Sequence, residues 1–469
     1  MEETRKYLRS FLSQNKIEVP ISKHSLFDDF IANETNIESV KIIKENQQMI
    51  MANWMLKTRI DDIILQSVLL PNGTVNKNYE SKIDFIKLGW NDIVYSEIKN
   101  LEDTGLTFNN DDDLLYGNPK VSGDLKIKLL FRVEGELEDS ILNEKLITVI
   151  INPDPKSLWK NIESDKNDPF WKEDNVAVLG KFLDKNIVIA SKRGRSHANV
   201  GSFRDDDFAF KNSNETGWCV LAVSDGAGSA SLSREGSKLA CDLIIEYFEE
   251  NFKEENLKEF DETLLNHHNK TDEDSSKKIS HFVYNNLSKA AHYTHKKIEE
   301  FAIKNEKELR DFHSTLIFTL VKKYDFGYAI LTFGVGDCPI GLLNKDLTEI
   351  KLMNWLDVGE FGGGTRFITM PEIFQSDKFP SRFGFKLVDD FSYLMLMTDG
   401  IYDPKFMVEA NLEKIEKWNE FLGDLQGIND DGYKVDFSAE NTEITNQLST
   451  WMDFWSPGNH DDRTLAIIY

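Results

Sequence analysis

Cysteine is scarce in this chain of 469 residues, and long apolar runs are missing. Only three cysteines are present and none has Cys-x-x-Cys spacing, which argues against a disulfide framework and a structural zinc site. No run approaches the ~18 apolar residues that a membrane-spanning helix needs. The N-terminal stretch MEETRKYLRSFLSQNK lacks the apolar core of a signal peptide. These absences predict a cytoplasmic protein.

Positive charge is also in short supply. The chain has 55 basic and 80 acidic residues, and its net charge is −25. Nucleic acids and anionic membranes are bound by clustered Lys and Arg, so this balance argues against both as partners. Because 40% of the residues are hydrophobic and 29% are charged, the composition predicts a globular protein. The length predicts two or three domains.

The chain divides into four regions by sequence texture. Residues 1–66 have apolar residues at helical spacing, and residues 67–152 are short alternating runs between turn residues, typical of a small β-sandwich. Residues 153–177 hold three prolines and many charges and are predicted to be a linker. From 178 to 469 strands and long helices alternate, which predicts one α/β domain.

The β-rich region has a recognisable order of motifs. LPNGTVNKNY followed by GLTFNNDDDLLYGNPKVSGDLKIKLLF resembles the immunoglobulin-like (cadherin-like) repeat over about 80 residues. Asn76 and Tyr116 depart from the usual residues of that pattern. The resemblance implies a module that binds or spaces, so its functional content is an interaction surface.

Aspartates meet the ends of apolar strands at five places in the last region. They are Asp205, Asp206 and Asp207 after NIVIAS and its following loop, Asp225 after WCVLAVS, Asp337 after GYAILTFGV, Asp399 after YLMLMT, and Asp461 and Asp462 before the final strand. One such aspartate is ordinarily a turn former or a helix cap. Several carboxylates gathered at one end of a core repel each other unless a cation neutralises them. Oxygen ligands without thiolates select Mg²⁺ or Mn²⁺.

The motifs RDDDFAF, VSDGAGSA, GVGDCPIGLL, LMTDG and DDRTLAII, in this order, resemble the metal-dependent serine/threonine phosphatases of the PP2C type, most closely a bacterial branch. The resemblance covers about 290 residues. It implies an α/β fold with a central β-sandwich of two sheets flanked by helices, preceded here by the helical segment and the small all-β module.

The resemblance also assigns metal-ligand roles. It implies Asp225 between two central ions with the Gly226 carbonyl also a ligand, Asp399 and Asp461 on the first ion, Asp205 on the second with Asp206 acting through water, and Asp337 on a third, weaker site. Asp462 stands next to the metal, where the family often has Asn. At position 205 the family usually has Glu or Gln, so Asp207 stays open as an alternative to Asp205.

The phosphate-gripping residue departs from the family pattern. That pattern commonly has an Arg four residues before the acidic pair, and here the position is Gly201. Arg195, His197 and Arg204 are the alternatives, and His197 fits the Ser-His texture of the bacterial branch. A histidine that serves only the core or a loop is an equally good interpretation.

The function implied by the resemblance is hydrolysis of phosphoserine or phosphothreonine in proteins, by water activated between two Mn²⁺ or Mg²⁺ ions. The expected partner is a phosphorylated protein, such as a cognate kinase or its target. One alternative is a catalytically weak sensor with the same fold, whose signature would be lost ligands, but every ligand position is filled. A metal nuclease is a second alternative, and the acidic composition argues against it.

Overall fold

The structure is a computed structural model that describes residues 2–213, 215–357 and 364–469. The chain separates into two units, Met1–Leu158 and Trp159–Tyr469, and all the candidate metal ligands lie in the second. Among the described helices, none combines the length and the apolar character that crossing a membrane requires.

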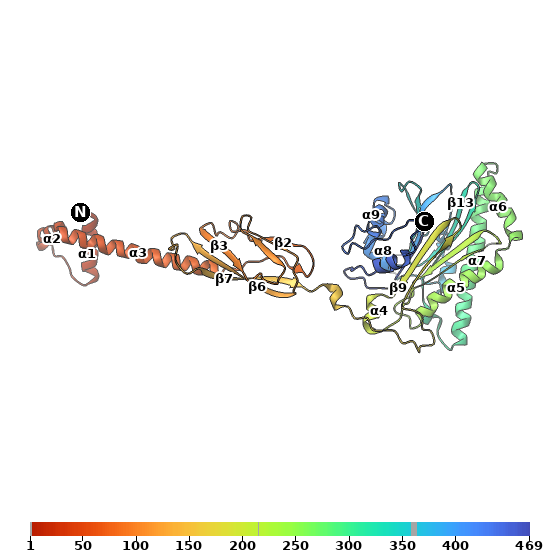
Figure 1. The fold of residues 1–469 in the computed structure, drawn as a ribbon, viewed down its shortest axis with the longest axis horizontal. Helices are drawn as coiled ribbons and strands as arrows, with labels where there is room; N and C mark the ends of the chain where they lie inside the picture. The colour runs from red at the N-terminus through yellow and green to blue at the C-terminus, as the bar shows by residue number, and fades with distance from the viewer. Residues whose placement is uncertain (1, 214, 358–363) are drawn as a thin grey trace. The chain divides into compact units, whose positions relative to one another are not determined.

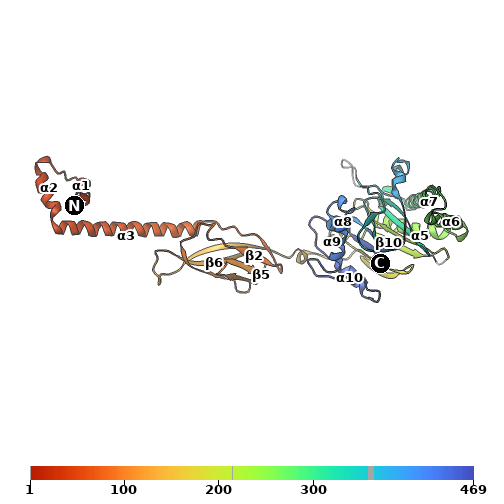
Figure 2. The same ribbon diagram turned by 90° about the horizontal axis from the view of Figure 1, so that it is seen from above.

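Three helices begin the first unit: α1 (Glu2–Gln14), α2 (His24–Ala32) and α3 (Glu34–Leu65). The Asn33 side chain caps α3 by accepting hydrogen bonds from the backbone N–H groups of Thr35 and Asn36, at 3.0 and 3.4 Å. In Figure 2, α1 and α2 lie against the first part of α3. Their shared core is small and contains the buried residues Leu8, Phe27, Ile31 and Val40.

Seven strands complete the first unit: β1 (Gly73–Thr74), β2 (Tyr79–Lys82), β3 (Ile93–Lys99), β4 (Leu106–Asn109), β5 (Leu114–Gly117), β6 (Gly123–Val133) and β7 (Asn143–Asn152). They form a four-stranded sheet of order β1-β7-β6-β3 and a three-stranded sheet of order β2-β5-β4. Side chains from both sheets, such as Leu115 and Ile127, and Ile63 from α3 share one core. Whether this arrangement is immunoglobulin-like stays a prediction.

Two larger sheets form the centre of the second unit. The five-stranded sheet has the order β10-β11-β12-β13-β16, and the six-stranded sheet has the order β15-β14-β17-β18-β9-β8. All neighbouring strands in both sheets are antiparallel. The strands are β8 (Asn175–Phe182), β9 (Lys185–Lys192), β10 (Asp207–Asn212), β11 (Trp218–Ser224), β12 (Leu316–Tyr324), β13 (Gly327–Val335), β14 (Ile340–Asn344), β15 (Ile350–Leu352), β16 (Phe383–Val388), β17 (Phe391–Met397) and β18 (Arg463–Ile468).

Helices cover the outer faces of both sheets (Figure 1). Helices α5 (Ser233–Asn251), α6 (Glu254–Asn269) and α7 (Ser275–Lys304) share a core with the five-stranded sheet. Helices α8 (Asp399–Phe406), α9 (Ile415–Leu425) and α10 (Ile444–Trp451) share one with the six-stranded sheet. The short helix α4 (Arg195–Val200) lies between β9 and β10 in the chain. The predicted sandwich of two sheets flanked by helices is confirmed.

The alternation of side chains along β11 explains why this strand is apolar throughout. Leu221 and Val223 point into the core between the two sheets, whereas Val220 and Ala222 point into the core beneath the helices. Successive side chains on a strand face opposite sides, so a strand covered on both faces needs an uninterrupted apolar run. The polar residues begin where the strand ends, at Ser224 and Asp225.

The segment 159–174, expected to belong to a linker, packs onto the second unit. The Phe170 ring packs edge-on against the Phe301 ring of α7, with their centroids 6.2 Å apart. Asp168 forms an ion pair with Arg234 at 2.9 Å. The Lys172 side chain is 9% exposed, and its ammonium group forms an ion pair with Asp207 at 2.9 Å. The segment is therefore part of the second unit's fold.

These contacts predict where the second unit can be cut. A fragment 159–469 should be as stable as the second unit of the full chain. A fragment 175–469 should lose several kcal/mol, because Asp207 is left buried without its ammonium partner and a broken buried ion pair costs about 3–5 kcal/mol. Denaturant unfolding followed by circular dichroism measures the difference, and equal stabilities of the two fragments would contradict the structural role of segment 159–174.

Candidate metal centre

Asp225 lies at the end of β11, in a position fixed by its backbone. Its N–H donates to Thr315 Oγ1 at 2.9 Å, and its carbonyl accepts from the Thr315 N–H at 2.8 Å. Burial raises the pKa of Asp225 well above its usual value, and the carboxylates of Asp399, Asp206, Asp461 and Asp337 raise it further. Five predicted ligands from separate segments therefore lie close enough together to repel one another.

Asp399 stands at the start of α8, directly after β17. Burial raises its pKa to about 7, and Asp461 and Asp337 contribute further. Its Oδ1 atom is buried and has no hydrogen-bond partner among the described residues. Buried polar atoms in native proteins are almost always paired, so this oxygen indicates a missing ligand.

Asp206 is the most buried carboxylate of the acidic run, with 1% of its surface exposed. Its Oδ2 atom accepts hydrogen bonds from Thr398 Oγ1 at 2.8 Å and Thr464 Oγ1 at 2.7 Å. Burial and the Asp462 carboxylate raise the pKa of Asp206 well above its usual value. The two hydroxyls fix one side of this carboxylate and leave its charge without a cation.

Asp462 and His197 form an ion pair beside Asp205. Asp462 accepts from His197 Nδ1 at 3.0 Å and from the backbone N–H groups of Gly194 and Asp205, both at 2.5 Å. Burial alone would raise the pKa of Asp462, but the contact with His197 holds it below its usual value. Burial alone would lower the pKa of His197, but Asp462 and Asp205 raise it to about 9. The imidazole is therefore a cation at neutral pH.

Asp205 and Asp207 have opposite electrostatic surroundings. Burial and Asp462 raise the pKa of Asp205 to about 6. Burial acts to raise the pKa of Asp207 too, but Lys172 and Arg204 lower it below its usual value. Asp207 already has its cations, so the geometry favours Asp205 as the candidate ligand.

Comparison with known proteins identifies the family of the second unit. The profile of the family described as "Protein phosphatase 2C" matches residues 193–452, more than half of the chain. The chain belongs to the protein phosphatase 2C family. The matched range contains Asp205, Asp225, Asp337 and Asp399 and ends before Asp461. No curated protein matches the chain.

Several solved structures are similar to this protein phosphatase 2C chain at low identity. The catalytic domain of the serine/threonine protein phosphatase PstP, solved with two manganese ions, is 14% identical with a TM-score of 0.36, over 62% of this chain and 98% of that one. The serine/threonine phosphatase Stp1 from Staphylococcus aureus is 14% identical with a TM-score of 0.34, over 62% and 96%. A bacterial serine phosphatase is 12% identical with a TM-score of 0.35, over 61% and 97%.

The residues at the centre fit the divalent cations that the protein phosphatase 2C family implies. The unpaired Asp399 oxygen and the raised pKa values of clustered carboxylates both indicate a missing positive charge. Gly226 is required beside them, because a Cβ there would lie 2.6 Å from the Asp205 carbonyl oxygen and 2.9 Å from Ser233 Cβ. All the predicted ligands offer oxygen, which suits Mg²⁺ and Mn²⁺.

A second group of candidate ligands is defined by distance alone. Ligand atoms of His197, Asp205 and Asp462 all lie within 4.8 Å of one another. However, both oxygens of Asp462 already accept hydrogen bonds, one of them from His197 Nδ1 at 3.0 Å. His197 and Asp462 therefore act as an ion pair at the edge of the centre.

The structure also places the candidates for phosphate contact. Gly201 ends α4 with φ of 75°, and a Cβ there would lie 2.9 Å from Ile162 Cγ2, so an Arg does not fit this position. Arg204 is buried and donates to Ser191 Oγ and the Asp206 carbonyl. Arg195 stacks over the Trp159 ring at 4.2 Å and pairs with Asp453 at 2.5 Å.

The sequence did not reveal four polar groups that hold the ligands. Thr398 and Thr464 bind Asp206, and Thr365 Oγ1 donates to Asp337 Oδ2 at 2.8 Å. Lys172 Nζ donates to the Asp206 carbonyl at 2.7 Å as well as to Asp207. Thr398 precedes a predicted ligand directly and could have been found from that position, whereas nothing local marks Lys172.

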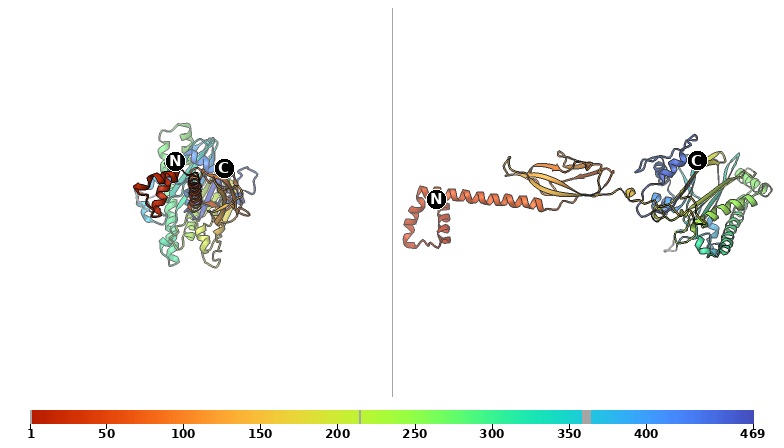
Figure 3. Two further views of the ribbon diagram at one scale, coloured as in Figure 1. Left: turned by 90° about the vertical axis from the view of Figure 1, so that its left-hand side faces the viewer. Right: turned by 60° about the horizontal axis from the view of Figure 1, so that its bottom comes forward.

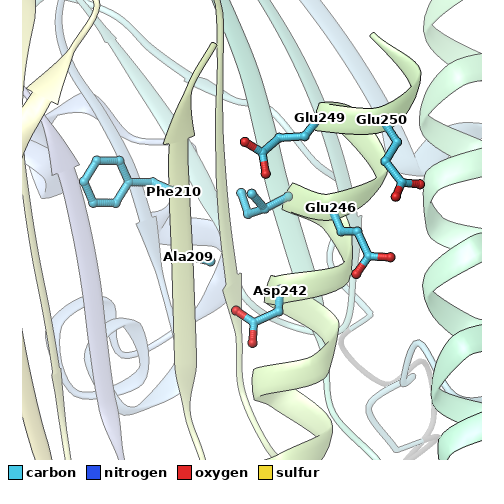
Figure 4. A pocket seen from close by; sticks show the side chains of 7 residues that line it. Ala209, Phe210, Asp242, Glu246, Glu249 and Glu250 are labelled. Carbon is cyan, nitrogen blue, oxygen red and sulfur yellow. The ribbon is translucent and has the colours of Figure 1, made fainter.

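A groove elsewhere on the second unit is unsuited to phosphate. It has a volume of about 510 Å³ and is lined by Ala209 and Phe210 of β10 and by residues of α5. Figure 4 shows four α5 carboxylates along it, from Asp242, Glu246, Glu249 and Glu250. Four carboxylates repel a phosphate group, so this groove does not compete with the strand-end centre as the place of the chemistry.

The pKa values predict how the metal-free protein responds to pH. Folding raises the pKa from 3.8 to about 6 for Asp205 and to about 7 for Asp399. At pH values between the unfolded and the folded pKa, the folded state therefore binds more protons than the unfolded state. His197 adds stability below its unfolded pKa of 6.5 and loses it as pH rises through about 9. All three groups make the free energy of unfolding fall as pH rises.

In chelator, the melting temperature should therefore be lower at about pH 8 than at about pH 6. Added Mn²⁺ should raise it more at the higher pH, because the ligands bind metal only when deprotonated. Asp399→Asn should flatten the pH dependence and reduce the Mn²⁺ gain, and Asp325→Asn, an exposed turn residue, should change neither. A metal-free protein equally stable at both pH values would contradict this electrostatic picture.

Proposed function

We propose that this protein is a metal-dependent phosphatase that hydrolyses phosphoserine or phosphothreonine in other proteins. The observation that carries the proposal is the group of five carboxylates formed by Asp225 and the four around it, which come from separate strand ends and repel one another. Such a group is stable with its carboxylates ionised only when divalent cations lie among them. Membership of the protein phosphatase 2C family supports the same reaction.

The proposed ligands follow the roles implied by the family resemblance. Asp225 and the Gly226 carbonyl would lie between two ions, Asp399 and Asp461 would complete the first site, and Asp205 with Asp206 the second, with Asp337 at a third. When bound, the ions supply Lewis acidity, lowering the pKa of a water nucleophile and offsetting charge on the phosphoryl oxygens. Thr398 and Thr464 orient Asp206 so that its remaining oxygen faces a fixed direction.

His197 is the proposed phosphate contact. Asp462 holds its Nδ1 atom at 3.0 Å, and its Nε2 atom lies 3.8 Å from Asp205 Oδ2, beyond hydrogen-bond distance. The Nε2 proton can therefore be donated to a phosphoryl oxygen beside Asp205. The Asp462 carboxylate, which is not itself a proposed ligand, favours the cationic ring through its contact with Nδ1. A hydrogen bond from a cation to a phosphate is stronger than one between neutral groups. Arg195 is the less suitable candidate, because Trp159 and Asp453 already engage its guanidinium.

The proposed substrate is a phosphorylated protein, and a kinase with an opposing activity, or a target of such a kinase, is the partner we infer. The net charge of −25 makes a nucleic-acid substrate unfavourable. The cytoplasmic location stays a prediction.

Asp225→Asn tests the proposed centre directly. It keeps the shape of the side chain but removes the charge that would hold the ions, so Mn²⁺-dependent hydrolysis of a phosphopeptide should fall about a thousandfold, ~4 kcal/mol of transition-state stabilisation. Asp325→Asn is the matched control and should keep full activity. Steady-state kinetics with Mn²⁺, with Mg²⁺ and with chelator give the comparison.

Two results would contradict the phosphatase proposal. Full activity of Asp225→Asn would remove Asp225 from the chemistry. A wild-type protein that binds Mn²⁺ and phosphopeptide but never turns over would favour the sensor alternative.

His197→Gln tests the phosphate contact. Glutamine keeps a hydrogen-bond donor for Asp462 but has no positive charge, so kcat/KM for phosphopeptide should fall about tenfold to a hundredfold. Mn²⁺ affinity, measured by calorimetry, should stay nearly unchanged. His281→Gln, at an exposed position on α7, is the control. Loss of thermal stability with kcat/KM unchanged would give His197 a purely structural role.

A further inference from the structure

The middle of α3 is an exposed stretch of helix with large apolar side chains. Every residue from Glu45 to Met55 is exposed. In Figures 2 and 3, α1 and α2 lie against one end of α3 only. Seven large side chains with exposed fractions of 39% to 70% lie in this part of the helix: Ile42, Ile43, Met49, Ile50, Met51, Trp54 and Met55. We call this set the α3 apolar stretch.

Five of the seven residues of the α3 apolar stretch lie in a segment without any charged side chain. Residues 46–56, NQQMIMANWML, contain no charged residue, although they make about three turns of helix. A solvent-exposed helix ordinarily carries charged side chains on its outer surface. A helix segment that is apolar or uncharged all round is typical of one that is covered in the functional protein.

The exposed area is large enough for a stable interface. At about 100° per residue, Ile42, Ile43, Ile50 and Trp54 share one side of the helix with the amides Asn46, Gln47 and Asn53. A large side chain that is half exposed offers roughly 100 Å², so this side offers about 600 Å², near the ~800 Å² that each partner contributes to a standard interface. Trp54 is 69% exposed and supplies much of this area. Tryptophan is also the residue type that most often dominates binding energy.

Charge identifies a second copy of the chain as the occupant. Residues 1–66 contain nine basic and ten acidic residues, so this region is nearly neutral in a chain of net charge −25. Two copies that meet here avoid the repulsion that the rest of the chain would impose. An anionic membrane is a poorer partner, because the region has no excess of positive charge.

The polar residues of the stretch also suit a second copy. Asn46, Gln47, Gln48 and Asn53 are all amides, and each has both donors and acceptors. An amide can hydrogen-bond its own counterpart across a two-fold axis, whereas a charged side chain there would repel it. Asparagines at helix–helix contacts are known to favour two-stranded pairing over higher assemblies. We propose that the protein is a homodimer in which the α3 apolar stretches of two copies pack against each other.

Sedimentation velocity of the full chain tests the proposal. At about 10 µM, a concentration at which an interface of standard size holds two proteins together, the wild-type mass should be twice 54.0 kDa. Ile50→Glu combined with Trp54→Glu places charges in the contact, and its mass should be that of one chain. Ile86→Glu combined with Ile141→Glu is the matched control, because these side chains are 80% and 93% exposed on the same unit but outside α3. This control should keep the doubled mass.

A milder pair guards against local unfolding. Ile50→Ala combined with Trp54→Ala favours the helix and removes contact area only, so the dissociation constant should rise at least about tenfold. Circular dichroism should show unchanged helix content in both variants. A wild-type chain of single mass at every concentration would overturn the proposal, as would a doubled mass in Ile50→Glu/Trp54→Glu. Binding of the monomer to phosphatidylserine vesicles in place of self-association would also overturn it.

Discussion

Repulsion between buried carboxylates is the constraint on which the rest of the second unit depends. Asp206, Asp225, Asp337, Asp399 and Asp461 come from strand ends far apart in the sequence, and the sandwich brings them to one place. Each would be easier to fold as a neutral residue, since burial favours the protonated acid. The surroundings instead fix their positions, through threonine hydroxyls at Asp206 and through a glycine at position 226. The repulsion lowers the stability of the metal-free fold, and binding of a divalent cation would restore it.

The sandwich and the strand-end aspartates were predictable because both leave local signals. An apolar run such as WCVLAVS predicts a strand that is buried on both faces, and polar residues begin where that burial stops. The order of five such strand ends then carries the resemblance to the family. The boundary of the second unit was not predictable in this way. Segment 159–174 is as polar as a linker, and it belongs to the fold because residues such as Lys172 and Asp168 pair with charged partners on other elements, Asp207 and Arg234.

Gly201 shows a different reason why sequence reasoning is incomplete. The missing arginine suggested a substitute elsewhere, but the structure gives the cause. Helix α4 ends at this residue with a left-handed backbone, and Ile162 of segment 159–174 occupies the space that a side chain would need. A residue type at one position was thus set by a contact 39 positions away, between Ile162 and Gly201. Such contacts have no signature in a single sequence.

The direction of each pKa shift separates carboxylates that the protein neutralises itself from those that need a ligand. Asp207 and Asp462 have lowered pKa values, because Lys172 and His197 lie beside them. Asp225 and Asp399 have raised values and only other carboxylates as close neighbours among the charged groups that shift them. Distance alone does not make this distinction, since it groups Asp462 with His197 and Asp205 as a candidate metal site. Among the strand-end aspartates, those without a cation of their own, such as Asp225 and Asp399, therefore define where a metal would bind.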